Sequence, residues 1–262
     1  AWDLLFVAVF HWGIAGAAYA TIFAQYVSGI GILLYVLFRC RSLFPERKDL
    51  CFDGGILKEI AGLSSLTCLQ QSVMNFGILM VQGLVNSFGA TTMAAFAAAV
   101  KIDTFAYLPV QDFGNAYSTF IAQNYGAGNK ERIHRGTKES FAISTAFSLV
   151  ISALVFAFAA PLMQIFVSSA ETAVIASGIR YLRIEGAFYF GIGCLFLLYG
   201  YYRAIKRAEM SVVLTVISLG IRVLLAYVLS ATFLGETGIW MAIPIGWILA
   251  DLTGLLYMRK TW

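Results

Sequence analysis

The chain has 262 residues, of which 60% are hydrophobic and 12% are charged, and its formal net charge is +4. Soluble domains are about 45–50% apolar and about 25% charged, and a globular core could not bury this much apolar surface. The composition therefore excludes a soluble enzyme, a disordered chain and a small disulfide-stabilised domain. It predicts an integral membrane protein.

Long stretches without Asp, Glu, Lys or Arg indicate where the chain crosses the membrane. They cover residues 4–38, 60–100 and 140–170, and each exceeds the roughly 20 residues that a spanning helix needs. Polar and apolar residues do not alternate in them, so we expect an all-α bundle and no transmembrane barrel. About seven complete spans and one partial span are predicted, near 1–11 (partial), 14–38, 59–87, 91–121, 139–166, 172–202, 210–233 and 237–258.

Basic residues gather at alternate ends of these predicted helices. All but four of the 18 lie in the segments 39–58, 123–138, 203–209 and 259–262, while the intervening turns contain none. The positive-inside rule predicts that these four basic segments of a multi-pass membrane protein are cytoplasmic. Because the charges are divided among separate helix ends, a nucleic-acid partner is not expected.

The sequence offers little for covalent or metal chemistry. It has two His and four Cys and lacks a Cys-x-x-Cys pair, so neither a metal site nor a disulfide is expected. The catalytic motifs GxSxG and HExxH and the Walker sequence are absent too. We therefore predict a protein without catalytic residues or cofactors. A membrane-embedded enzyme is the remaining alternative from another class, and it would require paired catalytic groups at one membrane depth.

A weak internal repeat relates the two ends of the chain. Gly13-Ile14-Ala15-Gly16 and Gly235-Glu236-Thr237-Gly238 share a GxxG pattern, and each precedes an apolar helix that ends in basic residues. Duplicated helical bundles are common among secondary transporters. The repeat suggests that 14–38 closes one bundle and 237–258 closes a related one.

Three segments resemble one transporter family. They are the sequence GIAGAAYAT at 13–21 followed by Gln25, the sequence QNYGAGNKER at 123–132, and the helix end GYYRA at 200–204. Their order and spacing are similar to those in multidrug and toxic compound extrusion (MATE) transporters, which have two six-helix lobes. The resemblance covers essentially the whole chain.

The resemblance implies a domain organisation and an activity. Residues 1–38 would be the last two helices of the N-terminal lobe, 39–58 the cytoplasmic inter-lobe loop, 59–258 the C-terminal lobe and 259–262 a cytoplasmic tail. Since the chain starts inside an apolar stretch without Met, we interpret it as a fragment whose partners include the missing N-terminal helices and the lipid bilayer. Family members export small amphiphilic organic cations in antiport with H⁺ or Na⁺ by alternating access. A flippase of the same superfamily for a lipid-linked substrate is the main alternative.

Ionisable residues at membrane depth are the candidates for ion coupling, because burying them costs about 2.5–3.5 kcal/mol each. In the helix predicted at 91–121, Asp103, Tyr107 and Gln111 recur at helical spacing on one face. A second stripe contains Lys101 and Asp112. Either Asp103 or Asp112 binds the coupling ion, or they form structural ion pairs with Lys101 as a structural or gating partner.

The remaining candidates lie on two other helices. Glu185 is an ion-coupling group or the partner of an arginine, and we favour the ion pair, with Arg180, Arg183 or Arg222 as the cation. Asp251 is a further acid that Arg222 could pair with. Further candidate cavity residues are the amides Gln70 and Asn75 and the aromatic residues Tyr181 and Tyr199.

The sequence departs from the family pattern in two places. Some members carry an acidic residue within the helix at 59–87, where this chain has amides, and others have an Asp where Ile192 stands here. These departures place a Na⁺ site of that type in doubt and leave H⁺ and Na⁺ both open.

Overall fold

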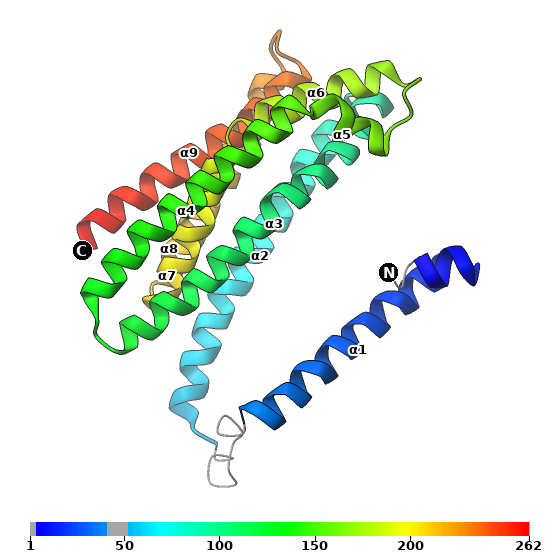
Figure 1. Ribbon diagram of the computed structural model, residues 1–262. Helices are drawn as coiled ribbons and strands as arrows, with labels where there is room; N and C mark the ends of the chain where they lie inside the picture. The colour runs from blue at the N-terminus through cyan, green and yellow to red at the C-terminus, as the bar shows by residue number, and fades with distance from the viewer. Residues whose placement is uncertain (1–3, 41–51, 262) are drawn as a thin grey trace. The chain divides into compact units, whose positions relative to one another are not determined.

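The computed structural model describes residues 4–40 and 52–261, and the regular structure in these two ranges is helical (Figure 1). A short π-helix, η1, spans Leu4–Val9. The α-helices are α1 (Gly13–Arg39), α2 (Gly54–Ser87), α3 (Ala90–Gly126), α4 (Lys130–Ala157), α5 (Ala159–Phe166), α6 (Thr172–Gly186), α7 (Tyr189–Ala204), α8 (Ala208–Ser230) and α9 (Glu236–Thr261).

Six of these helices are long and apolar enough to cross a membrane, and the bent pair α6–α7 raises the number to seven if it forms one span. The all-helical multi-pass bundle predicted from the sequence is confirmed. The chain divides into two compact units, Ala1–Leu57 and Lys58–Trp262. In the first unit the backbone N–H of Trp12 donates to the carbonyl of Phe6 at 3.1 Å, which holds η1 against the start of α1.

The second unit is built around α3 and α7. These two helices pack against each other, and α4 packs against both of them. The antiparallel pair α8–α9 contacts α7. An aromatic cluster fills the interior near the end that carries the α8–α9 turn. The rings of Phe96 and Trp240 stack at 5.6 Å, and Tyr181 meets Trp240 edge-on at 5.0 Å. Helices α3, α6 and α9 thus share one core contact.

Glycines let the helix backbones approach closely at two crossings. A Cβ atom on Gly200 of α7 would lie 2.7 Å from the carbonyl oxygen of Gly114 on α3. One on Gly246 of α9 would lie 2.4 Å from the carbonyl oxygen of Ser218 on α8. Small residues at helix contacts are the usual basis of close packing in membranes, and here they define the α3–α7 and α8–α9 interfaces.

The glycine-rich segment 123–132 forms the tight turn between α3 and α4. Gly128 has φ +68°, a conformation that glycine adopts without a steric penalty. The Asn129 side chain then accepts a hydrogen bond from the backbone N–H of Arg132 at 3.0 Å and caps α4.

Two predicted helices are broken in the structure. The helix predicted at 139–166 begins earlier, at Lys130, and ends at Ala157 before α5. Pro161 explains this end, because it has no N–H for the Ala157 carbonyl four residues before it.

The second break interrupts the helix predicted at 172–202, where α6 and α7 meet at a bend of 52°. The N–H groups of Phe188 and Gly191 donate to carbonyls three residues back, on Glu185 and Phe188. These tightened turns replace the α-helical ladder.

Candidate functional site: a cavity with two buried carboxyl groups

A cavity of about 450 Å³ lies within the second unit, between α2, α3, α6, α7, α8 and α9. Most of its wall is apolar or aromatic, with a few polar groups that converge on it. Its ionisable and amide residues are Gln82, Lys101, Asp103, Gln111, Glu185 and Arg222, and its aromatic residues are Phe96, Tyr107, Tyr181, Phe196, Tyr199 and Trp247. A largely apolar pocket with few polar groups is typical of small-molecule sites.

Two carboxyl groups from different helices meet in this cavity. Asp103 on α3 is 2% exposed and Glu185 on α6 is 6% exposed. The phenol of Tyr189, at the start of α7, donates a hydrogen bond to Oδ1 of Asp103. The two carboxyl groups also interact with each other and with Tyr181. The bend between α6 and α7 places Glu185 before the break and Tyr189 after it, so that both reach Asp103.

Each carboxyl group keeps one oxygen without a protein hydrogen-bond partner, Oδ2 of Asp103 and Oε2 of Glu185. A buried acceptor without a donor is costly, and a buried charge more so. These oxygens are therefore suited to bind a proton or a small cation.

Arg222 on α8 is the cation that acts on this pair. It lines the same cavity and interacts electrostatically with both Asp103 and Glu185. Among the described residues, the ion pairs within 4 Å are Arg135–Glu139, Arg180–Glu236 and Lys206–Glu59. Arg222 therefore faces the carboxyl groups without closing a salt bridge on either of them.

The other arginines considered as partners of Glu185 lie elsewhere. Arg180 pairs with Glu236 at 3.3 Å, and the guanidinium of Arg183 lies 5.3 Å from the ring centroid of Phe156. Of the three, Arg222 alone lines the cavity with Glu185.

The predicted stripe on α3 turns toward the cavity. Asp103, Tyr107 and Gln111 all line it, as the spacing of four residues predicts for one helix face. Lys101 lines its edge, and Tyr181 and Tyr199 line it from α6 and α7. The structure thus brings together seven of the predicted residues.

Three other predicted residues lie away from the cavity wall. Asp112 is exposed on α3, one position beyond Gln111 and on another helix face. On α2, Gln70 is buried and Asn75 is exposed, and neither lines the cavity, whereas Gln82 does. Asp251, the other acid considered for Arg222, is buried beside Cys194 on α7 and interacts with that thiol.

A hydrogen-bonded cluster around Glu236 was not predicted from the sequence. Its carboxylate accepts from Thr92 on α3 at 2.8 Å, from Ser177 on α6 at 3.1 Å, and from Arg180. The available signal was an acidic residue in the first turn of a helix, directly after Gly235. The cluster joins the first turns of α3 and α9 to the middle of α6.

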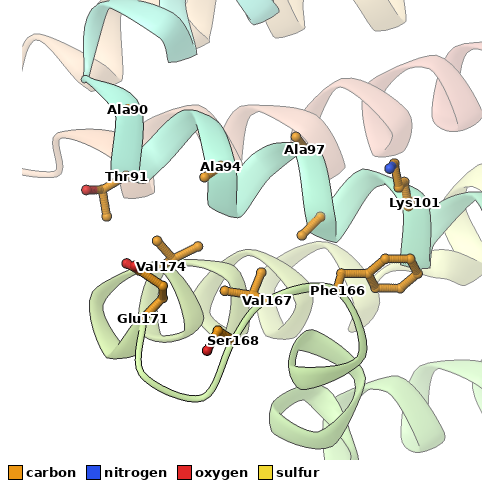
Figure 2. A pocket seen from close by; sticks show the side chains of 11 residues that line it. Ala90, Thr91, Ala94, Ala97, Lys101, Phe166, Val167, Ser168, Glu171 and Val174 are labelled. Atoms are coloured by element: carbon orange, nitrogen blue, oxygen red, sulfur yellow. The ribbon is translucent and has the colours of Figure 1, made fainter.

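A second hollow of about 590 Å³ lies beside this cluster, between α3 and the connection from α5 to α6. Figure 2 shows α3 from Ala90 to Lys101 above the loop that carries Ser168 and Glu171. Ala97 and Lys101 line both this groove and the cavity. Lys101 therefore stands at the boundary between the two hollows.

Within the described residues, no group of three His, Cys, Asp or Glu side chains is arranged to hold a metal ion. The polar centre of the molecule consists of two carboxyl groups, one guanidinium and several phenols. Such a set can bind protons, monovalent cations or charged organic molecules, and it contains no activated nucleophile.

Comparison with known proteins agrees with this architecture. Residues 66–228 match the model of the MatE family. The chain is 31% identical over 258 residues to the probable multidrug resistance protein YpnP of Bacillus subtilis, covering 97% of this chain and 56% of that protein. It is 28% identical to the probable multidrug resistance protein NorM of Thermotoga maritima, covering 94% of this chain and 53% of that protein.

Solved structures share the fold. A MOP superfamily transporter from Pyrococcus furiosus superposes with a TM-score of 0.90 at 24% identity, over 99% of this chain and 59% of that one. The structure of a MATE protein in complex with MaL6 gives the same values. The chain thus spans just over half the length of these relatives. On the family match over 66–228 and the shared helical bundle, this chain is a multi-pass membrane protein that belongs to the MatE family.

Proposed function

We propose that the protein is a secondary active multidrug efflux transporter that exports amphiphilic organic cations in exchange for H⁺ or Na⁺. The observation that carries this proposal is the pair of buried carboxyl groups, Asp103 and Glu185, in an aromatic-lined cavity inside a membrane-spanning bundle. The names of the Bacillus and Thermotoga relatives, both probable multidrug resistance proteins, support the choice of substrate class.

The cavity suits an amphiphilic cation on chemical grounds. The rings of Tyr107, Tyr181, Phe196 and Tyr199 line it, and an aromatic face attracts an organic cation by about 0.5–2 kcal/mol per contact. The unpartnered carboxyl oxygens supply the opposite charge.

If substrate and coupling ion compete for these carboxyl groups, each one displaces the other. Their affinities are then coupled reciprocally. This competition is the simplest basis for antiport, with the site exposed alternately to the two sides of the membrane.

The proposed orientation places the basic segments 39–58, 123–138 and 203–209 and the C-terminus in the cytoplasm of a bacterial cell. The described parts of three of them support it, because the α3–α4 turn, the α7–α8 turn and the end of α9 lie at one end of the second unit (Figure 1). The turns between α5 and α6 and between α8 and α9 lie at the opposite end and lack Lys and Arg. We further propose that transport requires additional helices of the same transporter, since the relatives are almost twice as long.

The test is ethidium efflux by the full-length protein in everted or intact vesicles, with either a Na⁺ or a pH gradient imposed. Efflux driven by one gradient identifies the coupling ion. The Asp103→Asn variant should lose efflux by a factor of ten or more (about 1.4 kcal/mol per factor of ten) at unchanged protein level. Asp112→Asn is the matched control on the same helix, and it should retain efflux because Asp112 lies outside the cavity wall.

A second candidate function is transport of an anionic aromatic molecule. Lys101 and Arg222 line the same cavity, and together they could pair with a diphosphate while the aromatic residues stack on a flat ring. One relative, a FAD transporter of Shewanella oneidensis, is 25% identical over 88% of this chain. A lipid-linked anion, the substrate of a flippase, would use the same two cations. Efflux of FAD or of a lipid-linked substrate without efflux of ethidium would favour this alternative.

A further inference from the structure

The cavity is lined by two acids and two basic residues, but only one of the basic residues acts on the carboxyl groups. Asp103 and Glu185 contribute two carboxyl groups, and the guanidinium that interacts with both belongs to Arg222. Lys101 is exposed at the edge of the cavity, where it also lines the second hollow, between α3 and the connection from α5 to α6. The titratable and charged groups that line the cavity or contact its carboxyl groups are Lys101, Asp103 and Tyr107 on α3, Tyr181 and Glu185 on α6, Tyr189 and Tyr199 on α7, and Arg222 on α8.

Arg222 interacts with both carboxyl groups but forms a salt bridge with neither of them. Its Nε is buried and has no hydrogen-bond partner, and neither carboxyl group lies within 4 Å of it in an ion pair. Oδ2 of Asp103 and Oε2 of Glu185 are likewise unpartnered. The three groups line the same cavity, and each has a polar atom that is available to a further ligand.

Charge balance decides what that ligand is. With both carboxyl groups ionised and Arg222 charged, the three groups carry one net negative charge. An uncompensated charge is costly within a membrane-spanning bundle, so one additional positive charge is required. A second monovalent ion or a divalent ion would leave the site positive.

We propose that Arg222 is the fixed counter-ion of the Asp103–Glu185 site and limits its capacity to one monovalent cation, either a proton or Na⁺. This inference rests on the proposed function, in which the carboxyl groups bind the coupling ion. It adds the rule that sets how many ions are exchanged per substrate. Arg222 acts here as a positioning and selectivity residue.

The test counts the cations held by the site in the purified full-length protein. Bound ²²Na⁺ is measured at equilibrium, and protonated carboxyl groups are counted from the infrared carbonyl stretch. Each count is taken relative to the double variant Asp103→Asn/Glu185→Gln, which removes both carboxyl groups and keeps Asp251. The sum of sodium ions and carboxyl protons gives the capacity of the site.

We expect a capacity of one cation for the wild type and for Arg222→Lys, which keeps the charge. Arg222→Gln should double the capacity to two cations and should allow Mn²⁺ to displace ²²Na⁺. The double variant Arg222→Gln/Glu185→Gln removes one charge of each sign and should return the capacity to one. This return separates a charge rule from local damage, because the arginine is absent in both variants.

The outcomes distinguish this inference from the proposed function. If Arg222→Gln is folded and still holds one cation, Arg222 does not set the capacity and the inference is wrong. If the wild type holds no more than the reference variant, the cation site itself is absent and the proposed function fails with it. If Arg222→Gln fails to fold while Arg222→Gln/Glu185→Gln folds, uncompensated carboxyl charge is the cause and the inference is supported. Failure of both to fold would make Arg222 a packing residue and overturn it.

Discussion

Asp103 depends on a neighbour from a separate helix. The Tyr189 phenol donates to one of its carboxyl oxygens while the other has no protein partner. In Tyr189→Phe the Asp103 carboxyl group would lose this donor, and the loss of a partner costs about 1–3 kcal/mol for a buried acceptor. We expect a lower Tm in detergent and weaker efflux, measured by a fluorescence thermal shift and by ethidium transport. Tyr227→Phe, at an exposed position on α8, should change neither, and an equal loss in both variants would refute the assignment.

Glu236 has a comparable role at the end of the bundle. Its carboxylate accepts hydrogen bonds from Thr92, Ser177 and Arg180, and hydrogen bonds to charged groups contribute about 1.5–3 kcal/mol each. Glu236→Gln should therefore lower the Tm by several degrees. Glu139→Gln is the control, since its pair with Arg135 is exposed and such pairs contribute about 0–1 kcal/mol. Equal thermal shifts in the two variants would contradict this assignment.

The sequence indicated part of this site because one helix carries it. Asp103, Tyr107 and Gln111 share a face of α3 by their spacing, and ionisable groups at membrane depth are rare. The contacts of Glu185 with Asp103 and of Glu236 with Thr92 join helices far apart in the chain. Periodicity describes a single helix, so it could not choose among the acids and arginines that lie on different helices.

At the scale of helices, composition predicted the spans but not their breaks. Charge-free stretches locate apolar helices well, and α1, α2, α3, α8 and α9 all overlap their predicted ranges. The end of α4 follows from Pro161, a signal that is local and was available. The bend between α6 and α7 has no such signal, since no proline lies between Tyr181 and Ala204. The bend coincides with the contacts that Glu185 and Tyr189 make with Asp103. These are tertiary contacts between helices, which a local pattern does not predict.

The α8–α9 interface depends on the absence of one side chain. A Cβ on Gly246 would lie 2.4 Å from the carbonyl oxygen of Ser218, and a backbone atom cannot move aside as a side chain can. Gly246→Ala should therefore separate the two helices and destabilise the protein by about 1–3 kcal/mol, seen as a lower Tm. Gly220→Ala on α8 is the matched control, because no atom lies within 4 Å of its added Cβ. Alanine is favoured over glycine in helices by about 1 kcal/mol, so the control should be neutral or stabilised, and a loss of stability there would contradict the packing argument.

For the whole molecule, the asymmetry of charge between the two ends of the second unit predicts its orientation in the membrane. In a variant without native cysteines, a cysteine in place of Lys130 should react with a membrane-impermeant maleimide in inside-out vesicles only. A cysteine in place of Phe233, which is 97% exposed in the α8–α9 turn, should react in right-side-out vesicles only. Ile143→Cys, on an exposed apolar face of α4, should react in neither, since the reagent does not enter lipid. Labelling of positions 130 and 233 from the same side would contradict the odd number of crossings between them. Labelling of position 130 in right-side-out vesicles and of position 233 in inside-out vesicles would show the reverse orientation.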